Sequence, residues 1–152
     1  TSQVASAATR ITEEWREQRR QLERVRMDLA GAAAKDLLDG ATTLGGVKIV
    51  VRRVEGEMQD LMALSKEICA DPKATAILGA KSKDGAILIV SHGSDVPLDA
   101  RDVFSEAIKS IGGKGGGRAD FTQGAGPNAE GLDEALALAL RLTREQLSKL
   151  SG

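Results

Sequence analysis

Residues 47–54 read V-K-I-V-V-R-R-V, a run of β-branched side chains that is typical of a strand. Apolar residues then recur at helical spacing over residues 57–70, and Asp71-Pro72 ends that pattern. A strand that leads directly into a helix indicates the start of an α/β arrangement.

Two short apolar runs follow, at Thr75–Leu78 and Ala86–Val90. The residues between them are polar and turn-like, so the two runs predict an antiparallel hairpin. Asp99 is a suitable N-cap for a helix that ends at Ile111, and a last amphipathic helix is expected over 132–150. We therefore predict a small α/β globular domain with a mixed sheet over residues 41–152.

The first 40 residues have a different pattern, which predicts a coiled-coil-like helical stalk. Its repeat has the spacing 4,3, is interrupted only at Gln18, and is formed by Val4, Ala8, Ile11, Trp15, Leu22, Val25, Leu29 and Ala32. The heptads favour one continuous helix over a helical hairpin. The apolar stripe needs a partner, which is a missing part of the protein, a second copy or the globular domain. Contact with a second copy makes these the expected dimerisation residues: Val4, Ile11, Trp15, Leu22, Val25 and Leu29.

The composition limits the class of protein. The chain has 152 residues, 21 basic against 22 acidic side chains, and 28% charged residues, which excludes a membrane-embedded protein. One Cys and one His exclude a disulfide framework and argue against a zinc cage. The chain begins with Thr1 and carries no signal segment, so we expect a fragment or processed product located in the cytoplasm.

The segment Gly112–Gly126 is the most unusual part of the sequence, because it holds seven of the 17 glycines. It begins G-G-K-G-G-G-R, and glycine backbone N–H groups together with Lys114 and Arg118 suit an anion. It lacks the spacing of a P-loop and follows a helix. We expect a glycine-rich loop over residues 112–126, which is either a flexible connector or a binding loop.

The sequence offers no constellation of catalytic groups. The run S-H-G-S-D at 91–95 places Ser, His and Asp side by side, whereas the members of a triad come from separate segments. We interpret His92 as a surface-loop histidine and Cys69 as a core residue. The chain alone is therefore expected to have no catalytic residue and no metal ligand.

The glycine-rich run, G-G-K-G-G-G-R-A-D-F-T-Q-G-A-G, resembles the C-terminal domain of alanyl-tRNA synthetases, a domain type that also accompanies DHH-family phosphoesterases. The residues in step with that family's pattern are Gly113, Lys114, Gly115, Gly116, Gly117, Arg118, Asp120 and Gln123. Ala119 departs from the family's Pro, and Ala125 departs from its Gly. The resemblance extends over most of the chain and is weakest over residues 1–40. The sequence of residues 76–85 is more similar to archaeal members of the family.

This resemblance implies a non-catalytic module of an alanine–tRNA ligase. The module would bind the elbow of tRNA-Ala through the eight residues in register, couple aminoacylation to editing, and support a homodimer through its stalk. It implies no cofactor for the chain itself, whereas ATP, Mg²⁺ and Zn²⁺ would serve upstream domains of the parent enzyme. Two alternatives stay open: a pure oligomerisation module, and the substrate-binding half of a DHH-type phosphoesterase.

Overall fold

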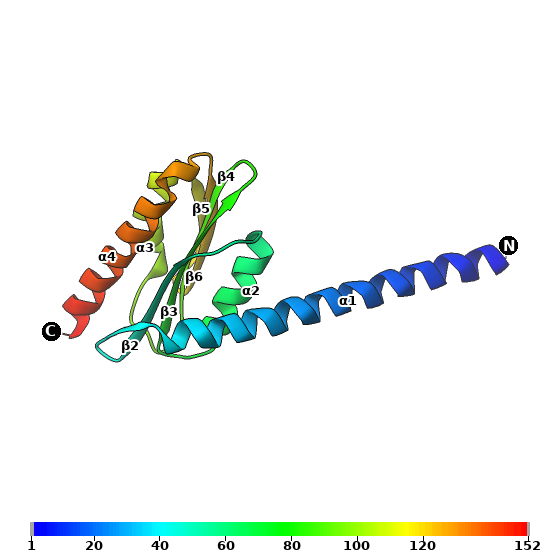
Figure 1. Ribbon diagram of the computed structural model, residues 1–152, viewed down its shortest axis with the longest axis horizontal. Helices are drawn as coiled ribbons and strands as arrows, with labels where there is room; N and C mark the ends of the chain where they lie inside the picture. Colours follow the sequence, from blue (N-terminus) through cyan, green and yellow to red (C-terminus); the bar gives the residue numbers. More distant parts are fainter. Residues whose placement is uncertain (1, 152) are drawn as a thin grey trace.

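The computed structural model describes the backbone of residues 2–151 and the side chains of residues 12–149. One long helix leads into a twisted sheet that has helices on both faces (Figure 1). In chain order the elements are α1 (Ser2–Asp39), β1 (Thr42–Leu44), β2 (Val47–Arg53), α2 (Met58–Ile68), β3 (Ala74–Ser82), β4 (Gly85–His92), α3 (Ala100–Ala107), the 3-10 turn η1 (Ile108–Ile111), β5 (Lys114–Arg118), β6 (Phe121–Gly126), η2 (Ala129–Gly131) and α4 (Leu132–Ser151).

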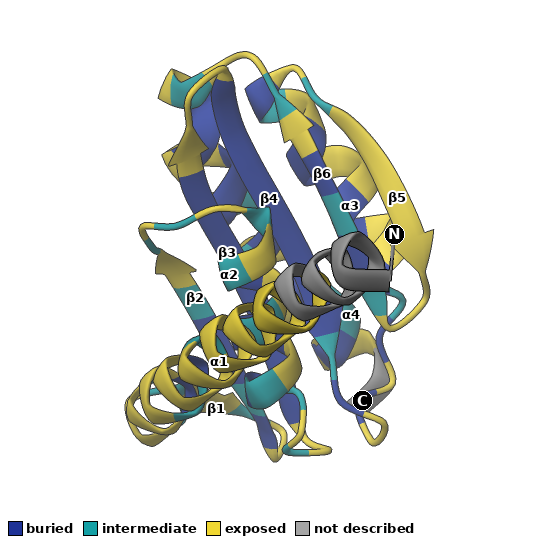
Figure 2. Cartoon of the chain, turned by 90° about the vertical axis from the view of Figure 1, so that its right-hand side faces the viewer, coloured by how far each residue is buried: buried dark blue, intermediate teal, exposed yellow. Residues whose placement is uncertain are grey.

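The six strands form one mixed sheet in the order β1-β2-β3-β4-β6-β5. β2 and β3 are parallel and are connected through α2, while every other neighbouring pair is antiparallel. The predicted α/β class, the mixed sheet and the antiparallel pairing of β3 with β4 are confirmed. β5 is an edge strand and is exposed along its whole length (Figure 2).

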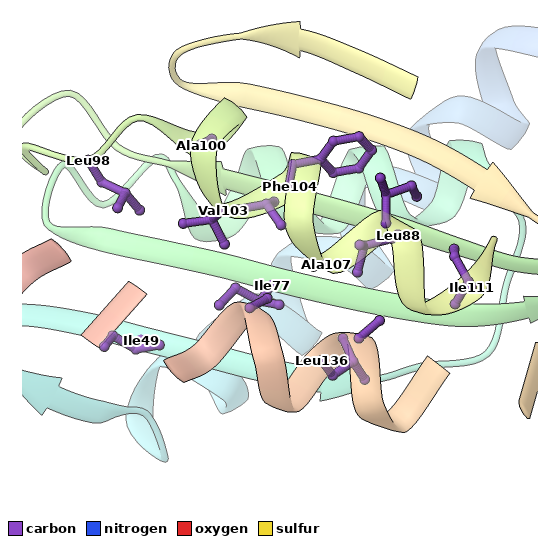
Figure 3. Close-up of a cluster of buried hydrophobic side chains, with 14 of the residues drawn as sticks. Ile49, Ile77, Leu88, Leu98, Ala100, Val103, Phe104, Ala107, Ile111 and Leu136 are labelled. Carbon is purple, nitrogen blue, oxygen red and sulfur yellow. The ribbon is translucent and has the colours of Figure 1, made fainter. Parts of the chain in front are cut away.

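The sheet separates two hydrophobic clusters. On one face α3 and α4 pack over alternate residues of β2, β3 and β4, with Ile77, Leu88 and Leu136 at the centre (Figure 3). On the other face α2 and the end of α1 cover the residues in between, such as Leu78 and Ile89. β3 and β4 are buried on both faces, which explains why their sequences are continuous apolar runs.

α1 is one continuous helix of 38 residues, as the heptads predicted. Its last turns pack on the domain, where Ala30 and Ala34 are buried and Arg26 binds Asp60 at 2.9 Å and Gln59 at 2.6 Å. The helix then extends away from the domain (Figure 1). No helix among the described residues has an apolar stretch long enough to cross a bilayer. The globular domain is therefore the partner of the C-terminal part of the stalk only.

Asp99 caps α3 as predicted, because its side chain accepts a hydrogen bond from the Arg101 backbone N–H at 3.0 Å. The hydrogen bonds from Arg101 are the main reason that the pKa of Asp99 is lowered. We expect Asp99→Ala to lower the free energy of unfolding at neutral pH by about 1 kcal/mol. A carboxyl group with a lowered folded-state pKa stabilises above about pH 4 and loses this effect as the pH falls, so the deficit should shrink in acid.

Urea unfolding of wild type and variant at neutral and acidic pH measures this effect. Asp99→Asn is the matched control, because Asn caps helices about as well as Asp and does not ionise. Equal stability of wild type and Asp99→Ala at neutral pH would show that the cap contributes nothing.

Candidate nucleic-acid interface

The glycine-rich segment is a β-hairpin, so the expected loop over residues 112–126 is wrong. Residues 114–118 form β5 and residues 121–126 form β6, joined by Ala119 and Asp120. β6 is inserted between β5 and β4, which anchors the hairpin to the central sheet. β5 is paired with β6 over its whole length, so the row of glycines is not a flexible connector.

The glycines of β5 are explained by close packing against β6, and not by a left-handed backbone conformation. Within residues 112–126 only Gly112 has a positive φ, of 64°. A Cβ at Gly115 would meet the Gln123 carbonyl oxygen and would lie 2.6 Å from Gly124 Cα, whereas a Cβ at Gly116 would meet nothing within 4 Å. Gly115 therefore faces its partner strand, and Gly116 faces open space.

Strand register decides which face of the sheet carries the charged residues. Lys114 pairs with Ala125, Gly116 with Gln123, and Arg118 with Phe121. Paired residues share a face, and Gln123 in turn pairs with Ile89, which packs in the cluster under α2. Lys114 and Arg118 therefore lie on the same face as α1 and α2, at the margin that the two helices leave uncovered (Figure 2).

The hairpin residues are open to solvent. Lys114 to Asp120 are all exposed, and the Arg118 side chain is 80% exposed even though its Nε lies 3.5 Å from Asp120 Oδ1. An exposed ion pair of this kind contributes little to stability, so Arg118 is available to an incoming anion. With glycines between the cations, backbone and charge are the only groups that β5 can offer a ligand.

A cleft of about 820 Å³ continues from the turn of the hairpin toward the stalk. Met27 of α1 and Met62 of α2 form part of its apolar wall, with Phe121 of β6. Its charged lining consists of Glu23, Arg26, Lys66, Arg118 and Asp120. Lys66 of α2 and Arg118 of β5 therefore line one cleft, although no pattern in the sequence connects them.

His92 is the last residue of β4 and is partly buried, so its interpretation as a surface-loop histidine is wrong. Nδ1 lies 2.7 Å from the Gly93 carbonyl oxygen, and Nε2 lies 2.9 Å from the Ala119 carbonyl oxygen. The His92 backbone N–H donates to the Asp120 carbonyl at 3.0 Å. The residue therefore touches the turn of the hairpin through both its ring and its backbone.

Cys69 lies at the end of α2, on the side that faces β4. Burial raises the pKa of its thiol, and Sγ lies 3.3 Å from Ser91 Oγ. A thiol that stays protonated at neutral pH is a poor nucleophile and a poor metal ligand. Among the described residues no three His, Cys, Asp or Glu side chains gather as a metal site would require.

The structure brings the eight family-register residues together on one hairpin, but not all on one face. Lys114, Gly116, Arg118 and Gln123 share the open face, while Gly115 and Gly117 alternate to the other. Gln123 is partly buried, and its Oε1 is buried without a hydrogen-bond partner. Gln123, the cross-strand partner of Gly116, thus holds an acceptor without a partner.

Two hairpin-anchoring contacts have no signal in the sequence. Thr122 donates from Oγ1 to the Val90 carbonyl at 2.7 Å, which ties β6 to β4. Phe104 of α3 packs beneath Gly124, where an added Cβ would lie 2.7 Å from the ring. Both contacts join residues more than 15 positions apart, so only the folded sheet reveals them.

The residues predicted to form a dimer contact lie on α1. Trp15 is 69% exposed, and Leu22, Val25 and Leu29 are also exposed. The side chains of Val4 and Ile11 lie outside the described residues. Leu22, Val25 and Leu29 line a groove of about 380 Å³ between α1 and α2, together with Leu61 and Leu64. The stalk therefore presents an uncovered apolar stripe.

Comparison with known proteins supplies the family. The model of the DHHA1 domain matches residues 46–145. The alanine–tRNA ligase of Natronomonas pharaonis is 37% identical over 146 residues, which are 95% of this chain and 16% of that protein. That of Pseudomonas syringae pv. tomato is 36% identical over 136 residues, which are 87% of this chain and 16% of that protein. These two relatives are almost equally identical to the chain, so the greater resemblance to archaeal members stays a prediction.

The fold is also known. The C-Ala domain of Aquifex aeolicus alanyl-tRNA synthetase aligns with a TM-score of 0.62 at 22% identity, covering 68% of this chain and 97% of that domain. The chain spans about one sixth of the length of the curated relatives, since it covers 16% of each. The family match covers β2 to α4 and includes the glycine-rich hairpin. The chain belongs to the DHHA1 domain family.

Proposed function

We propose that the chain is a non-catalytic RNA-binding module of an alanine–tRNA ligase, which contacts the elbow of tRNA-Ala through the β5–β6 hairpin. The observation that carries this proposal is the exposed edge strand β5, whose open face carries Lys114 and Arg118 on either side of Gly116. The relatives support the same assignment, because two that align with 95% of this chain are named alanine–tRNA ligases.

The chemistry of the hairpin suits a folded RNA. Exposed backbone N–H groups and two cations match phosphate oxygens and sugar hydroxyls, which dominate contacts with structured RNA. The chain has no Tyr, one Trp and two Phe, so it is poorly equipped to stack a series of single-stranded bases. Shape and charge are therefore the expected basis of recognition.

The proposal includes a role in the parent enzyme, which works in the cytoplasm with ATP, Mg²⁺ and Zn²⁺ in other domains. By holding the elbow, the module keeps one tRNA bound while its acceptor end moves between aminoacylation and editing sites. Titration of the chain with tRNA-Ala and with a transcript whose elbow is disrupted tests this contact. Equal affinities for the two RNAs would contradict the elbow assignment.

A second function, homodimerisation through the stalk, is favoured by the uncovered apolar stripe of α1. Trp15, Leu22, Val25 and Leu29 lie exposed along it, and the groove beside Leu61 and Leu64 extends the apolar surface onto the domain. A second stalk with the same stripe is the matching partner, because one symmetric contact covers both surfaces. The phosphoesterase alternative has no such observation in its favour.

We expect Leu22→Glu to weaken the dimer more than a hundredfold, because a symmetric interface loses the burial of two Leu side chains at about 1.5–3 kcal/mol each. Sedimentation equilibrium measures the dissociation constant, and Trp15 fluorescence reports burial of the stripe, because it is the only Trp. Gln21→Glu adds the same side chain one position off the stripe and should leave the dimer intact. A wild-type chain that is monomeric at high concentration would refute the stalk interface.

A further inference from the structure

The ring of His92 lies between two backbone carbonyl oxygens, and this arrangement depends on its protonation state. Nδ1 is 2.7 Å from Gly93 O, and Nε2 is 2.9 Å from Ala119 O, so both distances are those of hydrogen bonds. A neutral imidazole has one N–H and one lone pair, so it donates to one oxygen and turns the lone pair toward the other. An imidazolium donates to both. The geometry therefore fits the protonated ring.

Ala119 belongs to the turn that carries the charged end of the hairpin. Its carbonyl oxygen accepts a hydrogen bond from the Ala100 N–H at 2.7 Å as well as facing the His92 ring. Arg118 and Asp120 flank Ala119 in sequence, and their side chains form the exposed pair at 3.5 Å. A change in the contact between His92 and Ala119 is thus transmitted directly to the backbone that positions Arg118.

We propose that His92 is a positioning residue for RNA: its protonated ring fixes the β5–β6 turn in the conformation that presents Arg118, so RNA binding is linked to proton uptake by His92. This inference rests on the proposed function. An imidazolium would also add a positive charge at the turn that follows Arg118, where the ring contacts the Ala119 carbonyl oxygen.

Charged groups of both signs surround the end of β4 where the ring lies. Asp99 at the start of α3 interacts electrostatically with His92, and the pKa of Asp99 is lowered chiefly by Arg101 and also by His92. The charged or titratable groups that line the same cleft as His92 are Glu23, Arg26, Lys66, Cys69, Arg118 and Asp120. Asp95 follows β4 in sequence, and Arg101 and Asp102 lie in the first turn of α3.

Histidine is the side chain whose ordinary charge change falls between about pH 5 and 8, and His92 is the only histidine of the chain. Carboxyl, lysine and arginine side chains ordinarily change charge outside that interval. The raised pKa of Cys69 keeps its thiol neutral there. A pH dependence of RNA affinity that disappears with the His92 side chain therefore reports His92 itself.

The test compares wild type with His92→Gln in binding to tRNA-Ala at about pH 6 and about pH 8, at one ionic strength. Wild type should bind about three- to tenfold more tightly at the lower pH, because one linked proton allows up to tenfold per pH unit. His92→Gln should show equal affinity at both pH values, because its amide does not ionise. Circular dichroism and urea unfolding check that the variant is folded.

A second measurement needs no variant. The ¹⁵N shifts of the imidazole in the wild-type chain, free and bound to tRNA, should show a larger fraction of the ring protonated on both nitrogens in the complex. The same pH dependence in wild type and His92→Gln, or a ring that stays neutral in the complex, would overturn the role of His92 and leave the proposed function standing. No binding of tRNA at any pH would overturn both.

Discussion

Gly115→Ala is expected to disrupt the glycine-rich hairpin and to weaken tRNA binding by tenfold or more. The added methyl group would meet the Gln123 carbonyl oxygen and would lie 2.6 Å from Gly124 Cα, and neither is the end of a flexible side chain. The two strands must separate to admit it, which costs about 1–3 kcal/mol, as overpacking does elsewhere in proteins. Urea unfolding and filter binding of tRNA measure the two effects.

Gly116→Ala is the matched control, because it makes the same chemical change one residue further along β5. Its methyl group would point into open space, with nothing within 4 Å. This variant should unfold like wild type, and any loss of tRNA affinity in it reports crowding of the open face by the methyl group. If Gly115→Ala were as stable as Gly116→Ala and bound tRNA equally well, the close packing of β5 on β6 would be irrelevant to binding.

The double variant Lys114→Ala/Arg118→Ala is expected to weaken tRNA binding by about tenfold to a hundredfold. Each cation can make one charge-assisted contact to phosphate, and such contacts contribute about 1.5–3 kcal/mol before solvent exposure reduces the effect. Loss of two phosphate contacts should also lower the slope of log affinity against log salt by about 2. Stability should change little, because both side chains are exposed.

Arg141→Ala/Arg144→Ala provides the control for net charge. Both arginines are exposed on α4, which covers the opposite face of the sheet from the open margin of β5. This variant removes the same number of positive charges and should keep the salt slope of wild type. A slope that falls equally in both double variants would mean that the RNA responds to overall charge and not to the hairpin.

Local signals in the sequence were sufficient for most of the fold. The β-branched residues of β2, the apolar runs of β3 and β4, and the Asp99 cap each depend on neighbours within a few positions. The parallel pairing of β2 with β3 agrees with the predicted mixed sheet. The short strand β1 was missed, since Thr42–Leu44 is too brief to show alternation.

The hairpin was missed for a physical reason. A strand is recognised by side chains that alternate between two faces, and β5 has side chains only at Lys114 and Arg118. Glycine also has a low strand propensity, so the local signal favours a loop. What makes residues 114–118 a strand is the pairing with β6 and the anchoring of β6 to β4, through contacts such as Thr122 to Val90.

The role of His92 was also outside the reach of the sequence. The run S-H-G-S-D contains the residue types of a catalytic triad, but residues adjacent in sequence cannot form one. The partner that matters is the Ala119 carbonyl, 27 positions away and without any side-chain signature. The segment that carries the candidate site is thus visible in the sequence, whereas the contact between His92 and its turn is visible only in the fold.

The central claim is that the open face of the β5–β6 hairpin contacts the RNA. An amide-resolved NMR titration of the ¹⁵N-labelled chain with tRNA-Ala tests it most directly, because each backbone N–H reports separately. The largest shifts are expected on Lys114 to Gln123, with smaller ones at Lys66 and His92, while α4 is unaffected. Shifts centred on α4, with an unchanged hairpin, would contradict it.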